Sequence, residues 1–156
     1  MLPGMDGLEA IRKIRANDAW KKLPVLVLIE GWGAAGKGSM IGKVIKNIDP
    51  RFFKVATMSA PSEEELRRPF LYRYMCQIPE QGKFTFLDSG WMEQTTQEVL
   101  RKELTGEDYE KRIESIRRFE RQLTDNGYLV LKFFMQIDKE EQKFRCLLYT
   151  SPSPRD

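Results

Sequence analysis

The fold of this chain is decided by one stretch, Glu30-Gly31-Trp32-Gly33-Ala34-Ala35-Gly36-Lys37-Gly38-Ser39. An unbroken apolar run, residues 25–29, leads into it, and a helix-compatible run, residues 40–48, follows it. Strand, glycine-rich turn and helix in this order are the setting that a phosphate-binding P-loop requires. The alternative interpretation is a glycine-rich turn that serves only the close packing of a strand against a helix.

The residue types in this stretch suit a bound anion. Glycines let the backbone turn so that successive N–H groups point inward, and the helix N-terminus behind them adds unpaired donors. Lys37 would add a mobile positive charge for a terminal phosphate. The spacing G-x-x-x-x-G-K is met by Gly31, Gly36 and Lys37, but Gly38 stands where the motif has Ser or Thr, and Ser39 comes one residue late. We expect phosphate to be bound by the loop residues Gly31, Gly33, Ala34, Ala35, Gly36, Lys37, Gly38 and Ser39.

Composition places the chain among ordinary globular proteins. Its 156 residues suffice for one core, and the formal net charge of +3 permits an anionic ligand without indicating a nucleic-acid binder. The sequence contains no histidine, which excludes histidine-based triads and histidine-bearing zinc sites, so any general base must be a carboxylate. The two cysteines share no spacing motif, and no apolar run approaches a membrane span. We therefore expect a cytoplasmic protein that binds neither nucleic acid nor a membrane.

Three further strands are expected, at 52–58, 83–88 and 128–135. Two apolar runs on either side of one helix predict a right-handed βαβ unit, and so an α/β fold with a mostly parallel sheet. The strand at 83–88 closes on Asp88, the usual place for a carboxylate that helps to hold Mg²⁺ beside a P-loop. An aspartate in an ordinary turn is the alternative.

Arginines accompany two of the expected helices. Ser62 and Glu65 have the spacing of a capping box, which predicts one helix that ends before Pro79 and turns Leu66, Phe70 and Tyr74 inward. Arg67, Arg68 and Arg73 lie along this helix, and further basic residues flank an apolar stripe between 109 and 123. For both sets a solvated face, with pairing to nearby glutamates, is an alternative to phosphate binding.

The two ends differ from the middle of the chain. Within residues 1–23, the stretch Leu2-Pro3-Gly4-Met5-Asp6-Gly7-Leu8-Glu9-Ala10 resembles the turn after the phospho-acceptor strand of response-regulator receiver domains. The acidic pocket of such a domain would lie before Met1, so we assign no receiver function. The resemblance is either accidental or marks a foreign fragment joined near Leu23-Pro24. Residues 146–156 include a stretch rich in serine and proline and are expected to be a disordered, non-native tail.

Residues 24–145 resemble the family-2 polyphosphate kinases, P-loop kinases that move phosphate between polyphosphate and nucleotides. The resemblance is carried by five stretches in the same order: 30–38, 60–65, 119–123, 131–134 and 139–142. It implies a P-loop kinase-like three-layer sandwich that is incomplete here, truncated at its C-terminal side. It also implies Mg²⁺ as cofactor and polyphosphate with AMP, ADP or ATP as partners. Both a homo-oligomer and a second fused copy of the domain fit this resemblance.

Position by position, the resemblance implies three catalytic side chains. Lys37 matches the P-loop lysine, Asp88 matches the aspartate on the metal side, and Arg73 matches an arginine that faces phosphate. Three positions depart from the family. Gly33 stands where the family usually has Asp, and the family's Asp-Arg-Ser-Trp-Tyr-Asn-Arg segment appears as residues 88–94 without its arginines, which are Ser89 and Gln94 here.

These departures leave two hypotheses of function. One is a polyphosphate-dependent nucleotide phosphotransferase. The other is a non-catalytic, phosphate-binding or structural copy within a two-domain polyphosphate:AMP phosphotransferase, whose less complete N-terminal copy the chain resembles. Loss of an arginine that stabilises the transferring phosphoryl group lowers rates by about 10³-fold or more, which favours the second hypothesis for this chain alone. A generic P-loop nucleoside kinase shares the chemistry but explains fewer of the five stretches.

Overall fold

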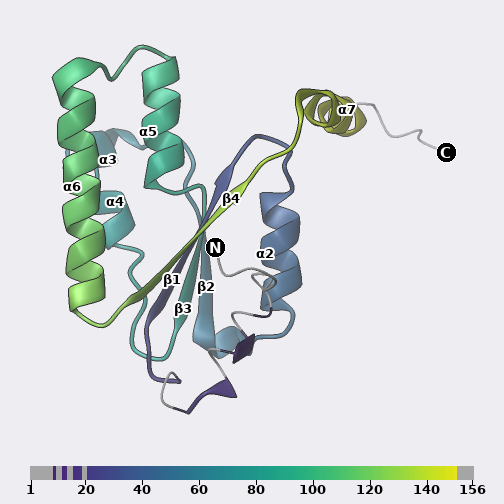
Figure 1. Cartoon of the computed structure of the whole chain (residues 1–156), viewed down its shortest axis with the longest axis vertical. Coiled ribbons are helices and arrows are strands. Elements are labelled where there is room, and N and C mark those ends of the chain that lie inside the picture. Colours follow the sequence, from purple (N-terminus) through teal and green to yellow (C-terminus); the bar gives the residue numbers. More distant parts are fainter. Residues whose placement is uncertain (1–8, 10–11, 14–15, 19–20, 151–156) are drawn as a thin grey trace.

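A four-stranded parallel sheet forms the centre of the molecule (Figure 1). The structure, a computed structural model, describes residues 9, 12–13, 16–18 and 21–150. The strands are β1 (Val25–Gly31), β2 (Phe53–Thr57), β3 (Phe84–Asp88) and β4 (Leu129–Met135), in the order β2-β3-β1-β4. All three strand pairs are parallel, which confirms the α/β fold and the parallel sheet expected from the sequence.

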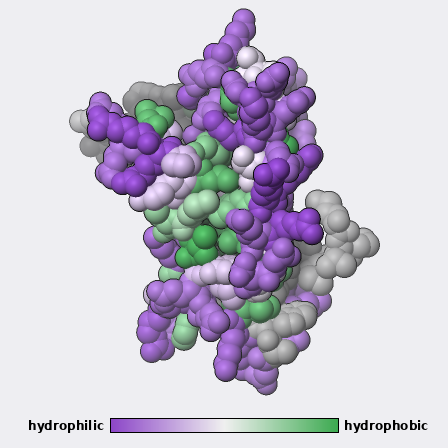
Figure 2. All heavy atoms as spheres, turned by 90° about the vertical axis from the view of Figure 1, so that its left-hand side faces the viewer, coloured by the Kyte–Doolittle hydropathy of each residue, from purple (hydrophilic) through white to green (hydrophobic). Residues whose placement is uncertain are grey.

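Helices cover both faces of the sheet, which makes the three-layer arrangement (Figure 1). On one face lies α2 (Lys37–Ile45), which is followed by the short 3₁₀ helix η1 (Pro50–Phe52). The other face carries a group of four helices, α3 (Glu63–Leu66), α4 (Tyr72–Met75), α5 (Trp91–Leu100) and α6 (Gly106–Asp125). The last helix, α7 (Lys139–Thr150), follows β4. Figure 2, a view from the α6 side, shows hydrophobic residues gathered in the middle of this face between hydrophilic ones.

Strand β1 supplies both halves of the core because its side chains alternate between the two faces of the sheet. Val25, Val27 and Ile29 pack in a cluster with Ile41 and Val44 of α2. Leu26 and Leu28 belong to a second cluster, which also holds buried residues of α4, α5 and α6. All five residues from Val25 to Ile29 are fully buried, as the unbroken apolar run predicts for a central strand covered on both faces.

The helix expected after Ser62 is wrong in its length. The capping box exists: the Ser62 hydroxyl accepts a hydrogen bond from the backbone N–H of Glu65, and the Glu65 carboxylate accepts one from the N–H of Ser62. The helix, however, ends at Leu66, and α4 starts only at Tyr72, because Pro69 lies between them and has no N–H to continue the helix. Leu66, expected to face inward, is 70% exposed.

The end of the described chain also differs from expectation. Helix α7 runs to Thr150, past Cys146, where the sequence predicts the start of a disordered tail. Residues 151–156 lie outside the described part, as do most of the receiver-like residues 1–23. Within the part that the structure describes, no helix is both long enough and apolar enough to cross a membrane.

A candidate phosphate-binding site at the P-loop

The loop between β1 and α2 has its shape because two glycines adopt backbone angles that other residues avoid. Gly31 has φ 137°, and Gly36, which precedes the first residue of α2, has φ 94°. The Trp32 N–H donates a hydrogen bond to the Met135 carbonyl oxygen at 3.1 Å, which ties the start of the loop to β4. The strand, loop and helix predicted from the sequence therefore occur in that order, with Lys37 in the first turn of α2.

Lys37 reaches back across the loop. Its Nζ donates a hydrogen bond to the Gly31 carbonyl oxygen at 2.9 Å and bonds the two carboxylate oxygens of Glu93 at 2.9 and 3.1 Å. Glu93 Oε2 also accepts a hydrogen bond from the Gly31 N–H at 3.1 Å, and Glu93 Oε1 accepts one from the Ser89 hydroxyl at 3.1 Å. Glu93 is thus a member of the site that the sequence analysis missed.

Asp88, the expected metal ligand, lies at the carboxyl end of β3 and interacts electrostatically with the same two side chains. Burial raises the pKa of Asp88, the positive charge of Lys37 lowers it, and the negative charge of Glu93 raises it. The structure therefore places Lys37 within electrostatic range of Asp88. It adds a second carboxylate, that of Glu93, beside them.

The described residues include no cluster of three or more metal-binding side chains of the His, Cys, Asp or Glu type. Mg²⁺ beside a P-loop, however, is usually held by one or two carboxylates, several waters and the phosphates of the substrate. Asp88 next to the P-loop lysine fits that pattern. The residues present are thus compatible with a magnesium ion that binds together with phosphate.

Arg73 is buried on α4, and its link to the site is a hydrogen bond to Gln94, the residue after Glu93. Its Nη2 donates to the Ser59 carbonyl oxygen at 2.6 Å, its Nη1 donates to Gln94 Oε1 at 3.4 Å, and its Nε lies 3.5 Å from Glu65 Oε1. These contacts hold the guanidinium among protein groups. The described contacts of Arg73 do not include Lys37, with which it is expected to hold phosphate.

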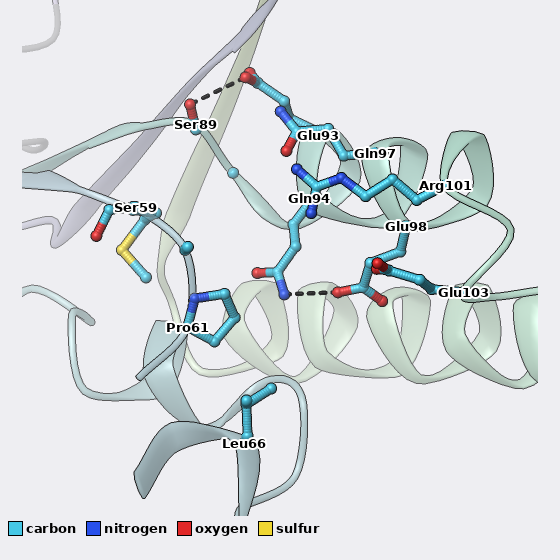
Figure 3. A pocket seen from close by; sticks show the side chains of 13 residues that line it. Ser59, Pro61, Leu66, Ser89, Glu93, Gln94, Gln97, Glu98, Arg101 and Glu103 are labelled. Carbon is cyan, nitrogen blue, oxygen red and sulfur yellow. Dashed lines mark hydrogen bonds between the residues drawn. The ribbon is translucent and has the colours of Figure 1, made fainter. Parts of the chain in front are cut away.

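A pocket of about 350 Å³ is lined in part by Ser89 and by Glu93, which contacts the loop (Figure 3). Its lining comes from residues 58–61, from Leu66 of α3 and from the segment between Ser89 and Glu103. Figure 3 shows Ser89 and Glu93 bonded to each other, and Gln94 bonded to Glu98 farther along α5. The lining contains three glutamates and one arginine, so the pocket is acidic overall.

Glu30 fixes the first turn of α5 and thereby the backbone of Glu93. Its Oε1 accepts hydrogen bonds from the backbone N–H groups of Met92 at 2.9 Å and Glu93 at 3.2 Å. A Cβ atom at Gly90 would lie 2.4 Å from the same oxygen, so this residue must be small. Burial raises the pKa of Glu30. Sequence reasoning missed this cap because a glutamate at the end of a buried strand gives no local sign of the helix that it contacts.

Helix α7 contacts the P-loop from the outside. Gln142 Nε2 donates to the Gly33 carbonyl oxygen at 3.0 Å, and Arg145 Nη1 lies 3.4 Å from the Ala34 carbonyl oxygen. Arg145 is itself held by an ion pair with Glu141 at 2.6 Å. Carbonyl oxygens of the loop are therefore hydrogen-bonded by side chains of α7, more than 100 positions later in the sequence.

Comparison with known proteins shows the family of this chain. The family described as Polyphosphate kinase 2 (PPK2) matches residues 7–150 of the 156. The chain belongs to the polyphosphate kinase 2 family. The match starts inside the receiver-like stretch, so the receiver resemblance of residues 1–23 stays only a prediction.

Individual members of the polyphosphate kinase 2 family show the same relationship. A polyphosphate:AMP phosphotransferase of Pseudomonas syringae is 35% identical over 78% of this chain and 24% of its own length. An AMP/ADP-polyphosphate phosphotransferase of Meiothermus ruber is 34% identical over 78% of this chain and 45% of its own length. A crystal structure of a polyphosphate kinase 2 from Pseudomonas aeruginosa superposes with a TM-score of 0.83 at 30% identity, over 94% of this chain and 33% of that chain. The chain thus spans 24% and 45% of the length of these two curated relatives.

Proposed function

We propose that this chain is a phosphotransferase-family domain that moves phosphate between polyphosphate and AMP or ADP. The observation that carries the proposal is the P-loop itself, with Lys37 Nζ 2.9 Å from the Gly31 carbonyl oxygen and the N-terminus of α2 behind it. Backbone N–H groups, a helix dipole and an ammonium group converge there, and together they favour a terminal phosphate. The activities in the names of the relatives support polyphosphate and a nucleotide as the two substrates.

In this proposal the residues of the chain act mainly by positioning and neutralising charge. Lys37 would contact the transferred phosphate, and Asp88 would hold Mg²⁺ together with phosphate oxygens. The metal, when bound, would neutralise the charge that develops on those oxygens. Arg73 would serve the site through its contacts with Gln94 and the Ser59 carbonyl group.

A second candidate function is a phosphate-binding copy with little or no catalysis, which braces an active copy of the domain. Specific observations favour it. Gly33 carries no carboxylate, and the side chain of Gln94 binds Tyr74 at 2.7 Å and Glu98 at 2.8 Å, where the family has an arginine. Under this reading, a second fused copy or a homo-oligomer would supply the missing charges. Location in the cytoplasm, where nucleotides are abundant, is part of the same proposal.

The two candidates are separated by incubating the purified chain with polyphosphate, Mg²⁺ and AMP or ADP, and following the next phosphorylated nucleotide. Turnover that is lost in Lys37→Ala would establish catalysis and contradict the non-catalytic reading. Phosphate binding without turnover would support the second candidate. A chain that shows neither turnover nor phosphate binding would contradict the proposed function.

A gain-of-function variant makes the test sharper. A Cβ atom at residue 33 would lie 3.7 Å from Gln142 Nε2, an ordinary contact, so Gly33→Asp should fold. Ser89 already has φ 70°, so Ser89→Arg adds no new backbone strain. If the missing carboxylate and guanidinium limit the rate, the double variant should turn over faster than the unchanged chain by about 10-fold or more. An unchanged rate would mean that other groups limit this copy.

A further inference from the structure

The carboxylate of Glu93 makes the contacts that a phosphate group would make in this loop. It binds an ammonium group, that of Lys37, a backbone N–H, that of Gly31, and a hydroxyl group, that of Ser89. These three donor types are the ones that P-loops and similar sites offer to phosphate oxygens. We infer that Glu93 is an internal occupant of the P-loop, which must swing out before a phosphate can bind Lys37. This inference rests on the proposed phosphate-binding function.

The ion pair of Lys37 and Glu93 is buried, so a ligand of Lys37 has to compete with it. The side chains of Lys37 and Glu93 are only 14% and 13% exposed, so the ion pair is largely shielded from water. An ion pair in such a position is screened less than one on the surface, and breaking it leaves a buried charge without its partner. A phosphate that takes Lys37 must therefore replace these contacts, not merely add to them.

The charge around Lys37 also opposes an incoming anion. Asp88 interacts electrostatically with both Lys37 and Glu93, so two carboxylates lie near one ammonium group. A polyphosphate that enters while Glu93 is in place meets a net negative site, and like charges at contact distance repel strongly when partly buried.

The movement that releases the loop is small. The backbone N–H of Glu93 is held by Glu30 Oε1 at 3.2 Å, in the first turn of α5, so the helix does not need to shift. Glu93 also lines the pocket of about 350 Å³ beside the loop (Figure 3). A change of side-chain rotamer toward this pocket would free Lys37 and the Gly31 N–H together.

The test is tripolyphosphate binding to the chain and to Glu93→Gln, measured by isothermal titration calorimetry with and without Mg²⁺. Glutamine keeps the size and one acceptor oxygen but removes the competing charge. We expect Glu93→Gln to bind about 10-fold tighter or more, because a desolvated ion pair no longer has to be broken. The matched control is Glu103→Gln, the same change at an exposed residue of the same pocket, which should alter the affinity less than about 2-fold.

Two outcomes would overturn the inference while leaving the proposed function intact. One is equal affinity of Glu93→Gln and the unchanged chain. The other is weaker binding by Glu93→Gln in Mg²⁺ alone, which would make Glu93 a metal ligand instead of a competitor. Glu93→Asn is a second variant that also removes the negative charge, and it should bind tripolyphosphate more tightly for the same reason. Circular dichroism shows whether each variant is folded.

A further control separates the role of Glu93 from the proposed binding of phosphate. Lys37→Ala combined with Glu93→Gln should lose the gain in affinity, because the released lysine is its source. Tripolyphosphate binding by none of the folded variants would overturn the proposed function and, with it, the role of Glu93.

Discussion

Gly31 and Met135 lie with their backbones so close that a Cβ atom at residue 31 would be 2.0 Å from the Met135 carbonyl oxygen. The two residues face each other at the end of the β1–β4 ladder. The P-loop therefore begins where the neighbouring strand leaves no space for a side chain.

Gly31→Ala should destabilise the fold. The new methyl group meets backbone, which cannot move aside without disturbing β4, and residue 31 has φ 137°. We expect a loss of about 2 kcal/mol or more in the free energy of unfolding, measured by urea denaturation. Gly33→Ala is the matched control, because its Cβ would be 3.7 Å from the nearest atom, and it should change stability by less than about 1 kcal/mol. Equal losses in the two variants would contradict the explanation.

Glu30 should make stability depend on pH. Burial raises its pKa above the ordinary value of 4.5, so the folded chain holds this proton more readily than the unfolded chain. The corresponding stability is fully present below pH 4.5 and is lost as the pH rises through the pKa of the folded state.

Glu30→Gln keeps an acceptor for the Met92 N–H but removes the titration. We expect the stability of the unchanged chain relative to this variant to fall as the pH rises above 4.5, measured by urea denaturation at a series of pH values. A relative stability that rises with pH over this range would show that the hydrogen bonds to the charged form outweigh burial.

Trp91 should be the most costly aromatic residue to remove. It is fully buried, its ring packs edge-on against Tyr74 and Phe119, and its Nε1 donates to Glu120 Oε1 at 2.9 Å. Trp91→Ala should lose about 3–5 kcal/mol, and Trp91→Phe, which keeps most of the packing, should lose less. Thermal and urea denaturation measure the stability losses of the two variants. Trp32→Ala, at a residue that is 42% exposed, should have a far smaller effect, and a loss as large as that of Trp91→Ala would be inconsistent with this packing.

The outer edge of β4 should promote self-association. Phe134 is 69% exposed, and among the described residues no strand pairs with β4 on the side away from β1. Open apolar edges favour pairing between molecules. We expect Phe134→Lys to reduce concentration-dependent association in light scattering. Phe144→Lys, the same change at an exposed residue of α7, should reduce it less, and an equal reduction would point to general charge instead of the edge.

Local features of this fold could be predicted from the sequence, and contacts between distant segments could not. The buried run Val25–Ile29 and the capping box of Ser62 and Glu65 depend on residues that are neighbours in the chain. The ion pair of Lys37 with Glu93 joins residues 56 apart, and the bond from Gln142 to Gly33 spans 109 positions. Such contacts follow from the order of the strands in the sheet, which periodicity does not reveal. Pro69 is a local sign of the break between α3 and α4, and the helical spacing of Leu66, Phe70 and Tyr74 predicts the opposite.

The position of β1 between β3 and β4 has a consequence for biosynthesis. Both strands that flank β1, and the α7 side chains that hold the loop carbonyls, come from later parts of the chain. At roughly 5–20 residues per second of translation, Lys37 leaves the ribosome several seconds or more before Arg145. During that interval the apolar run that leads into the P-loop has no complete sheet to join. The segment proposed to bind phosphate therefore gains its neighbouring strands, and the side chains that contact its carbonyl groups, only after most of the chain has been synthesised.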